Sequence, residues 1–140
     1  MSDNGERTVE RERILDADPE RVWDALTDEY VLSDWFAPGA TLEPVEGGEV
    51  SFECEDGERT GTVRVVEEER ELAFTWSRPG GGESLVTFTL EPVETGTRLV
   101  VTERALTGPT AMAIAGIAPG AVWSRRLRTL ELCLGRLVLA

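Results

Sequence analysis

The C-terminal stretch 119–140 predicts one long amphipathic helix. Pro119 suits its first turn, because proline has a fixed φ and lacks an N–H that would stay unpaired there. Large apolar residues follow at steps of four and three, which places them on one side of a helix; they are Trp123, Leu127, Leu130, Leu134 and Leu137. Some 20 residues at about 1.5 Å each make a rod of roughly 30 Å. The rest of the chain must therefore supply a long apolar surface.

Between residues 40 and 102 the period of the apolar residues changes to two. Alternating apolar and polar residues are typical of an antiparallel sheet with one buried and one wet face. We expect strands near 49–54, 62–65, 71–76, 86–90 and 98–102. Turn-forming residues separate them at 47–48, 56–57, 67–69, 79–82 and 95–96.

The N-terminal part predicts a strand and two short helices. A strand is expected at 8–16, and Asp18 can cap a helix whose first position is Pro19. Thr27-Asp28 can cap a second helix that ends near residue 36; its candidates for burial are Tyr30, Leu32, Trp35 and Phe36. The segments combine into an α+β fold, in which a meander with one apolar face must curve around the C-terminal helix.

Composition excludes several classes of function. The chain has no histidine and only two distant cysteines, Cys54 and Cys133, which argues against metal sites and against Ser-His or Cys-His catalysis. The net charge is −13, with 27 acidic and 14 basic residues. Such acidity argues against binding to nucleic acid or an anionic membrane. The one tight basic cluster, formed by Arg125, Arg126 and Arg128, is interpreted as the wet face of the helix. We expect no metal and no cofactor.

The length of 140 residues indicates one domain with a real core. We expect residues 1–7 to be disordered and residues 8–140 to form a single domain. The acidic N-terminus does not resemble a secretory signal, and no apolar run approaches the ~20 residues of a membrane span. These features indicate a cytoplasmic protein.

Six segments, in the right order, resemble motifs of SRPBCC proteins, which are START-like domains similar to the birch-pollen allergen. The similarity covers roughly residues 8–137 and is greatest to the Aha-type branch, named for an activator of heat-shock-protein ATPase. The matching segments are 18–28, Trp35-Phe36, Gly47-Gly48 with Val50 and Phe52, Gly61-Thr62-Val63, 72–76, and Gly96-Thr97-Arg98-Leu99.

The resemblance implies a helix-grip fold, in which a curved sheet of about six or seven antiparallel strands wraps around the long C-terminal helix. It also implies an apolar cavity between the sheet and that helix. Residues 108–118, rich in alanine and glycine, form either a flap over the cavity or a short packing helix. We expect a small apolar or aromatic ligand; a protein partner or a homodimer stays open.

Glu103 stands where the family usually has a polar residue such as histidine or serine. It continues the phase of Leu99 and Val101, so strand alternation directs it at the cavity, where it is a candidate catalytic acid or base. The alternative is a frayed strand end, with Glu103 paired in water with Arg104 or Arg98. The expected cavity residues are Trp35, Phe36, Phe52, Cys54, Val63, Val65, Phe74, Trp76, Phe88, Val101, Glu103, Trp123 and Leu127.

Three functions remain open. The first is a binding domain for a small hydrophobic molecule. The second is an enzyme of the polyketide cyclase type, in which the cavity orients a substrate and Glu103 moves protons. The third is a protein-binding module associated with a chaperone or a stress response. The aromatic residues could also do no more than fill the core, and both cysteines are read as small hydrophobes without a nearby cation.

Overall fold

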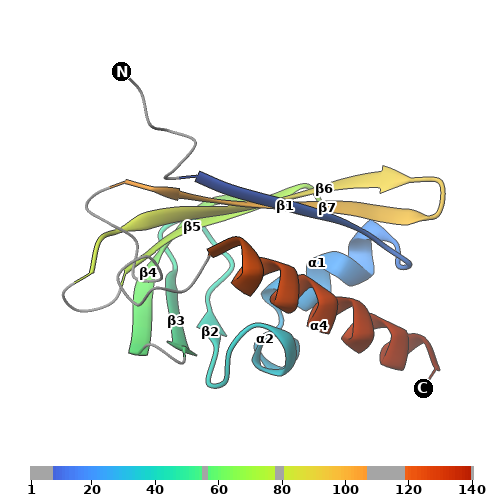
Figure 1. Cartoon of the computed structure of the whole chain (residues 1–140), viewed down its shortest axis with the longest axis horizontal. Helices are drawn as coiled ribbons and strands as arrows, with labels where there is room; N and C mark the ends of the chain where they lie inside the picture. The colour runs from blue at the N-terminus through green and yellow to red at the C-terminus, as the bar shows by residue number, and fades with distance from the viewer. Residues whose placement is uncertain (1–7, 55–56, 78–80, 107–118, 140) are drawn as a thin grey trace.

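The computed structural model describes residues 8–54, 57–77, 81–106 and 119–139 (Figure 1). One antiparallel sheet of seven strands has the order β1-β7-β6-β5-β4-β3-β2. The strands are β1 (Thr8–Leu15), β2 (Thr41–Leu42), β3 (Glu49–Cys54), β4 (Gly57–Glu67), β5 (Glu71–Ser77), β6 (Ser84–Val93) and β7 (Gly96–Ala105). The helix-grip α+β fold expected from the sequence is therefore confirmed.

The three described helices lie on the same side of the curved sheet (Figure 1). They are α1 (Pro19–Thr27), α2 (Glu29–Trp35) and α4 (Pro119–Leu139). The apolar stripe of α4 is buried at Trp123, Leu127, Leu130 and Leu134, whereas the side chain of Leu137 lies outside the described residues. The sheet thus provides the apolar surface that the amphipathic C-terminal stretch requires.

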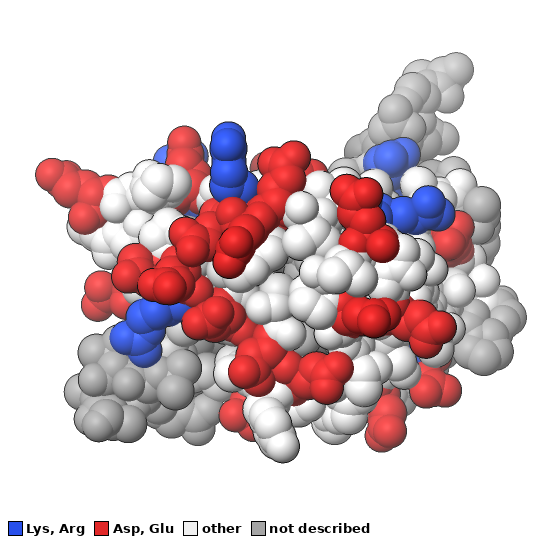
Figure 2. Space-filling view, turned by 180° about the vertical axis from the view of Figure 1, so that it is seen from behind, with Lys and Arg blue, Asp and Glu red and all other residues white. Residues whose placement is uncertain are grey.

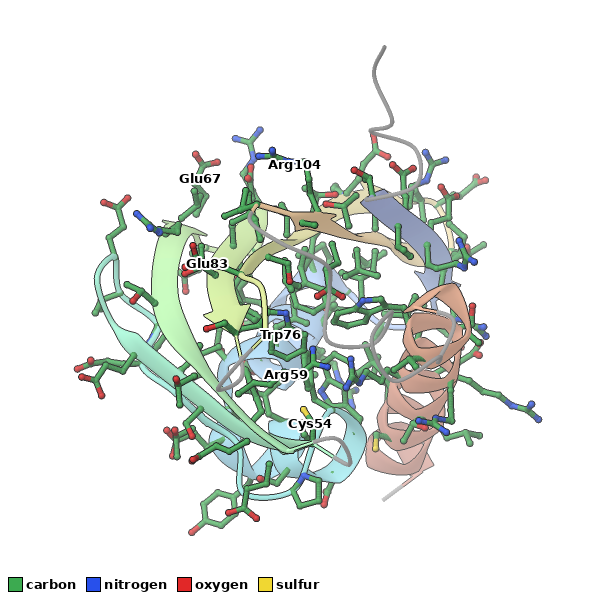
Figure 3. The ribbon with its side chains drawn as sticks, turned by 60° about the vertical axis from the view of Figure 1, so that its left-hand side comes forward. Cys54, Arg59, Glu67, Trp76, Glu83 and Arg104 are labelled. Atoms are coloured by element: carbon green, nitrogen blue, oxygen red, sulfur yellow. The ribbon has the colours of Figure 1, made fainter. Side chains whose placement is uncertain are left out.

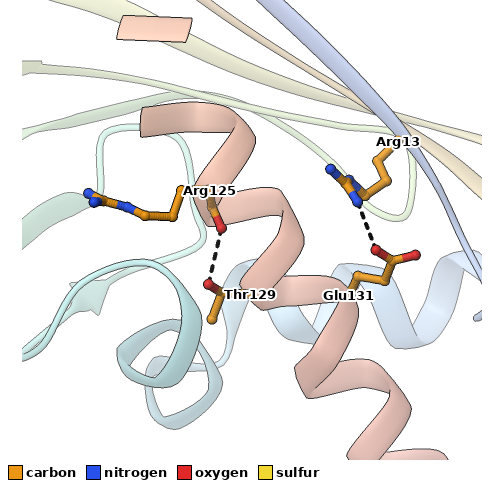
Figure 4. Close-up of polar contacts among 4 residues, drawn as sticks. All are labelled: Arg13, Arg125, Thr129 and Glu131. Atoms are coloured by element: carbon orange, nitrogen blue, oxygen red, sulfur yellow. Dashed lines mark hydrogen bonds and ion pairs between the residues drawn. The ribbon is translucent and has the colours of Figure 1, made fainter. Parts of the chain in front are cut away.

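Polar contacts of α4 include one with strand β1 and one within the helix (Figure 4). Arg13 of β1 pairs with Glu131 at 2.8 Å, and the hydroxyl of Thr129 donates to the carbonyl of Arg125 at 3.0 Å. Arg13 and Glu131 are both partly exposed, so their pair adds little stability. Burial of the apolar stripe therefore holds the helix in place.

Side-chain caps set the positions of α1 and α2, as the sequence predicts. Asp18 accepts from the N–H of Arg21 at 3.1 Å, and Asp28 accepts from the N–H of Tyr30 at 2.9 Å. The indole of Trp35 donates to the carbonyl of Ala25 at 2.8 Å, which joins α2 to α1. One prediction is wrong: the side chain of Tyr30 is 88% exposed, because it lies on the outer side of a two-turn helix.

A bulge in β4 shifts the alternation of inward and outward residues by one position. The register with β5 shifts between Val63 and Val65, so that Val63 faces Phe74 but Val66 faces Leu72. Val63 is buried and Val66 packs against the core, whereas Val65 lies opposite Ala73 on the other face. Val65 was expected in the cavity by simple alternation, and the extra residue of the bulge removes it.

Several expectations fall outside the described residues. These are the disordered N-terminus, the segment 108–118, and parts of the turns at 56–57 and 79–82. None of the described helices is both long and apolar enough to cross a membrane.

We predict that Asp28→Ala lowers the free energy of unfolding by about 1 kcal/mol, because it removes the cap of α2. Urea denaturation followed by circular dichroism measures the loss. Asp34→Ala is the matched control, since Asp34 is exposed on the same helix and does not cap it. An equal loss in both variants would contradict the capping role.

Candidate functional site

Seven aromatic rings meet between the sheet and α4. Phe36, at the end of α2, lies at the centre of this group, with its ring centroid 4.5–6.5 Å from those of the other six. Phe36 stacks on Phe52, and most of the other contacts are edge-to-face or tilted, as aromatic quadrupoles favour. The ring cluster consists of Trp35, Phe36, Phe52, Phe74, Trp76, Phe88 and Trp123.

Glu103 lies inside this apolar surrounding and is only 3% exposed. One carboxylate oxygen accepts from the indole of Trp76 at 2.9 Å and from the hydroxyl of Ser84 at 2.7 Å. The other oxygen accepts from the indole of Trp123 at 2.9 Å. The carboxylate therefore connects β7 with β5, β6 and α4, and three neutral donors stabilise it.

Strand alternation explains the position of Glu103. Leu99, Val101, Glu103 and Ala105 are all buried, so β7 keeps its phase to the end. The alternative of a frayed end does not describe this strand: Arg98 pairs with Glu12 and Glu91 at 3.8 and 3.6 Å, and Arg104 is exposed. The structure places Glu103 in the interior.

Two arginines also reach this interior, and sequence reasoning missed both. Arg59 on β4 is 3% exposed, and its guanidinium carbon lies 4.5 Å from the centroid of the Trp76 ring. Figure 3 shows Cys54, Arg59 and Trp76 directed into the space beside α4, whereas Glu67 and Arg104 point away from it. Arg59 lies directly opposite Phe52 in the β3–β4 pairing. Because Phe52 is buried, this pairing puts Arg59 on the inner face of the sheet, and strand alternation could have indicated that position from the sequence.

The interpretation of the basic cluster as a solvent-exposed face is wrong for Arg126. Its guanidinium carbon lies 4.8 Å from the centroid of Phe36 and 4.9 Å from that of Trp123. Burial lowers the pKa of Arg126, because desolvation disfavours the charged form; the positive charge of Arg59 acts in the same direction. Neighbouring positions on α4 thus carry an exposed Arg125 and a half-buried Arg126 whose guanidinium lies against the rings.

Cys54 has a cation beside it, which the sequence did not indicate. The Nη2 group of Arg126 contacts the Cys54 sulfur at 3.9 Å, from an element 72 positions along the chain. Cys54 is half-buried at the end of β3, whereas Cys133 is buried on α4. The expectation that no cation lies near either thiol is therefore wrong for Cys54.

The remaining expected cavity residues lie where alternation puts them. Val63, Val101 and Leu127 are buried in the same core as the seven rings, and only Val65 faces elsewhere. Within the described ranges no three metal-ligating side chains come together. Outside this interior the face seen in Figure 2 is dominated by carboxylates. In the described part of the chain, the ring cluster is thus accompanied by the carboxylate of Glu103 and the guanidinium groups of Arg59 and Arg126.

We predict that Glu103→Gln lowers the free energy of unfolding by about 2–3 kcal/mol. The amide puts an NH₂ group against one of the buried N–H or O–H donors, which then loses its charged acceptor. Chemical denaturation followed by tryptophan emission measures the loss. Glu94→Gln, at an exposed turn position, removes the same charge and is expected to change little. Equal stability of the two variants would contradict the bridging role of Glu103.

Comparisons with known proteins agree with this architecture. The family model described as "Activator of Hsp90 ATPase homolog 1-like protein" matches residues 16–135. A protein from Rhodobacter sphaeroides is 31% identical, with a TM-score of 0.75 and 93% of each chain covered. A protein from Mesorhizobium loti is 29% identical, with a TM-score of 0.82 and coverage of 93% of this chain and 98% of that one.

A third solved structure comes from the dynemicin biosynthetic locus. It is 26% identical with a TM-score of 0.76, and the match covers 92% of this chain but 47% of that one. No curated protein matches the chain significantly. Because the family model spans most of the sequence, the chain belongs to the Activator of Hsp90 ATPase homolog 1-like protein family, within the SRPBCC superfamily.

Proposed function

We propose that this protein binds a small apolar or aromatic molecule between the inner face of the sheet and α4. The observation that carries the proposal is the set of polar groups inside the ring cluster: Glu103 held by two indoles, and two guanidinium groups against aromatic faces. Sites for small molecules typically combine aromatic walls with a few placed polar groups.

Stability alone does not account for these polar groups. A buried charge loses hydration, and replacing buried ionic groups with well-packed apolar ones is often neutral or stabilising. A domain that needed only a core would gain by filling this space with leucine and phenylalanine. The presence of Glu103, Arg59 and Arg126 among the rings therefore supports recognition of a ligand.

The similarity to a protein of the dynemicin biosynthetic locus also supports a small-molecule role. That protein is described as a protein of a biosynthetic locus, and its matched region, 47% of its chain, shares the fold of this chain. The proposal for this chain requires that its own sheet and C-terminal helix also bind a small molecule.

The test compares two valines that are neighbours on β7 and face opposite sides. Val101 is buried on the inner face, whereas Val100 is half-buried on the outer face. We predict that N-phenyl-1-naphthylamine binds the wild-type protein saturably and quenches its tryptophan emission. Val101→Phe should weaken this binding about tenfold, equivalent to about 1.4 kcal/mol, because the added ring occupies the site. Val100→Phe should leave it unchanged.

The same pair of variants tests whether the interior has room. If the space were already full, Val101→Phe would overpack it and lower stability by about 1–3 kcal/mol. Failure of the wild-type protein to bind the dye, or equal binding by Val101→Phe, would contradict the proposal.

A second candidate is an enzyme of the polyketide cyclase type, favoured by the buried carboxylate of Glu103. In this function the site orients a folded substrate and Glu103 accepts or donates a proton. Both oxygens of Glu103 accept hydrogen bonds, so one of the hydrogen bonds from Trp76, Ser84 or Trp123 would have to break before Glu103 could take part in proton transfer. Unchanged turnover of an identified substrate by Glu103→Gln would exclude that role.

A further inference from the structure

We propose that the ligand of this site carries a carboxylate, and that the guanidinium of Arg126 binds it. The inference rests on the proposed binding function and adds the chemical class of the ligand: an aromatic acid. Arg126 projects from α4 onto the ring cluster, with its guanidinium carbon 4.8 Å from the Phe36 centroid, 4.9 Å from that of Trp123 and 5.7 Å from that of Trp76.

The guanidinium of Arg126 has an unused donor inside the protein. Its Nη1 group is buried, and no residue in the described part of the chain accepts a hydrogen bond from it. Its Nη2 group contacts the sulfur of Cys54 at 3.9 Å, and sulfur is a weak acceptor. A buried N–H without an acceptor is costly, so this donor is available for a ligand.

The buried carboxylate does not satisfy this arginine. Both oxygens of Glu103 are already engaged by Trp76, Ser84 and Trp123. No ion pair joins Arg126 to a carboxylate among the described residues, although Glu103 attracts it at longer range. A further anion close to Arg126 would therefore not have to displace an existing salt bridge.

Electrostatics around Arg126 favour an incoming anion. Desolvation lowers the pKa of Arg126, and Cys54 and Glu103 offset this only in part, while the charge of Arg59 adds to the lowering; the positive charge is therefore held at a cost. Arginine still stays protonated in proteins, so the charge remains and an anion would offset that cost. The planar guanidinium fork matches a carboxylate through two parallel hydrogen bonds.

The rings around Arg126 determine the rest of the ligand. Cation–π contacts hold the guanidinium against aromatic faces, so a carboxylate bound to it would place its own carbon skeleton among Phe36, Trp76 and Trp123. A planar aromatic skeleton fits such surroundings by stacking or edge-to-face contact. The overall charge of −13 repels anions, so a preference for an acid would have to come from this local cation.

The experiment uses a matched pair of probes, 2-naphthoate and 2-naphthamide, titrated into the 140-residue chain at about 0.15 M salt. The two share the same ring system and differ in the charge of one group. We expect the wild-type protein to bind the naphthoate about tenfold or more tightly than the amide, because a hydrogen bond to a charged group is the stronger one. Quenching of tryptophan emission reports both affinities.

Substitutions on α4 test whether Arg126 is the residue that causes the preference for the naphthoate. Arg126→Gln should abolish the preference, so that the two probes bind with equal affinity, and Arg126→Lys should retain part of it, because the charge remains without the fork. Arg128→Gln is the matched control: Arg128 is exposed on the same helix, so the same loss of charge should leave the preference intact. Circular dichroism checks that each variant is folded.

The outcomes separate this inference from the proposed function. If the wild-type protein binds both probes equally, or prefers the amide, the acid-binding role is wrong while the binding function stands. If neither probe binds, both fail. If Arg126→Gln changes only the rate at which iodoacetamide alkylates Cys54, the guanidinium acts on that cysteine and the inference is overturned.

Discussion

The carboxylate of Glu103 is the contact on which the interior depends. The C-terminal helix must bury Trp123 to lie on the sheet, and a buried indole N–H needs an acceptor. Glu103 provides it and also accepts from Trp76 and Ser84. One side chain thereby connects α4 to three adjacent strands, inside a layer that is otherwise aromatic. The packing of the sheet against the helix thus includes buried hydrogen bonds as well as apolar contacts.

The surroundings of that carboxylate give the interior its chemical character. Two guanidinium groups reach the same rings from β4 and α4, and Cys54 lies beside one of them. Apolar surroundings make the electrostatic interactions of each of these charges stronger than they would be in water. The face seen in Figure 2 is dominated by carboxylates, whereas the interior combines both signs of charge.

Local patterns predicted most of the architecture. The spacing of Trp123 to Leu134 predicted the helix and its buried side, and Asp18 and Asp28 predicted the two helix starts. Two errors came from local rules applied without context. Val65 follows perfect alternation, but the bulge after Val63 shifts the phase. Tyr30 is apolar enough to bury, but α2 has only one side against the core.

By itself, the sequence determined the elements, their order and the inward phase of Glu103, because capping, helical spacing and strand alternation act between near neighbours in the chain. Only the tertiary structure decided what surrounds that residue. Arg126 meets Cys54 across 72 positions, and Arg59 reaches Trp76 from the neighbouring strand. Long, flexible arginine side chains take their direction from the packing around them. The contact of Arg126 with the aromatic core therefore could not be read from the spacing of residues, whereas strand alternation did carry a signal for Arg59.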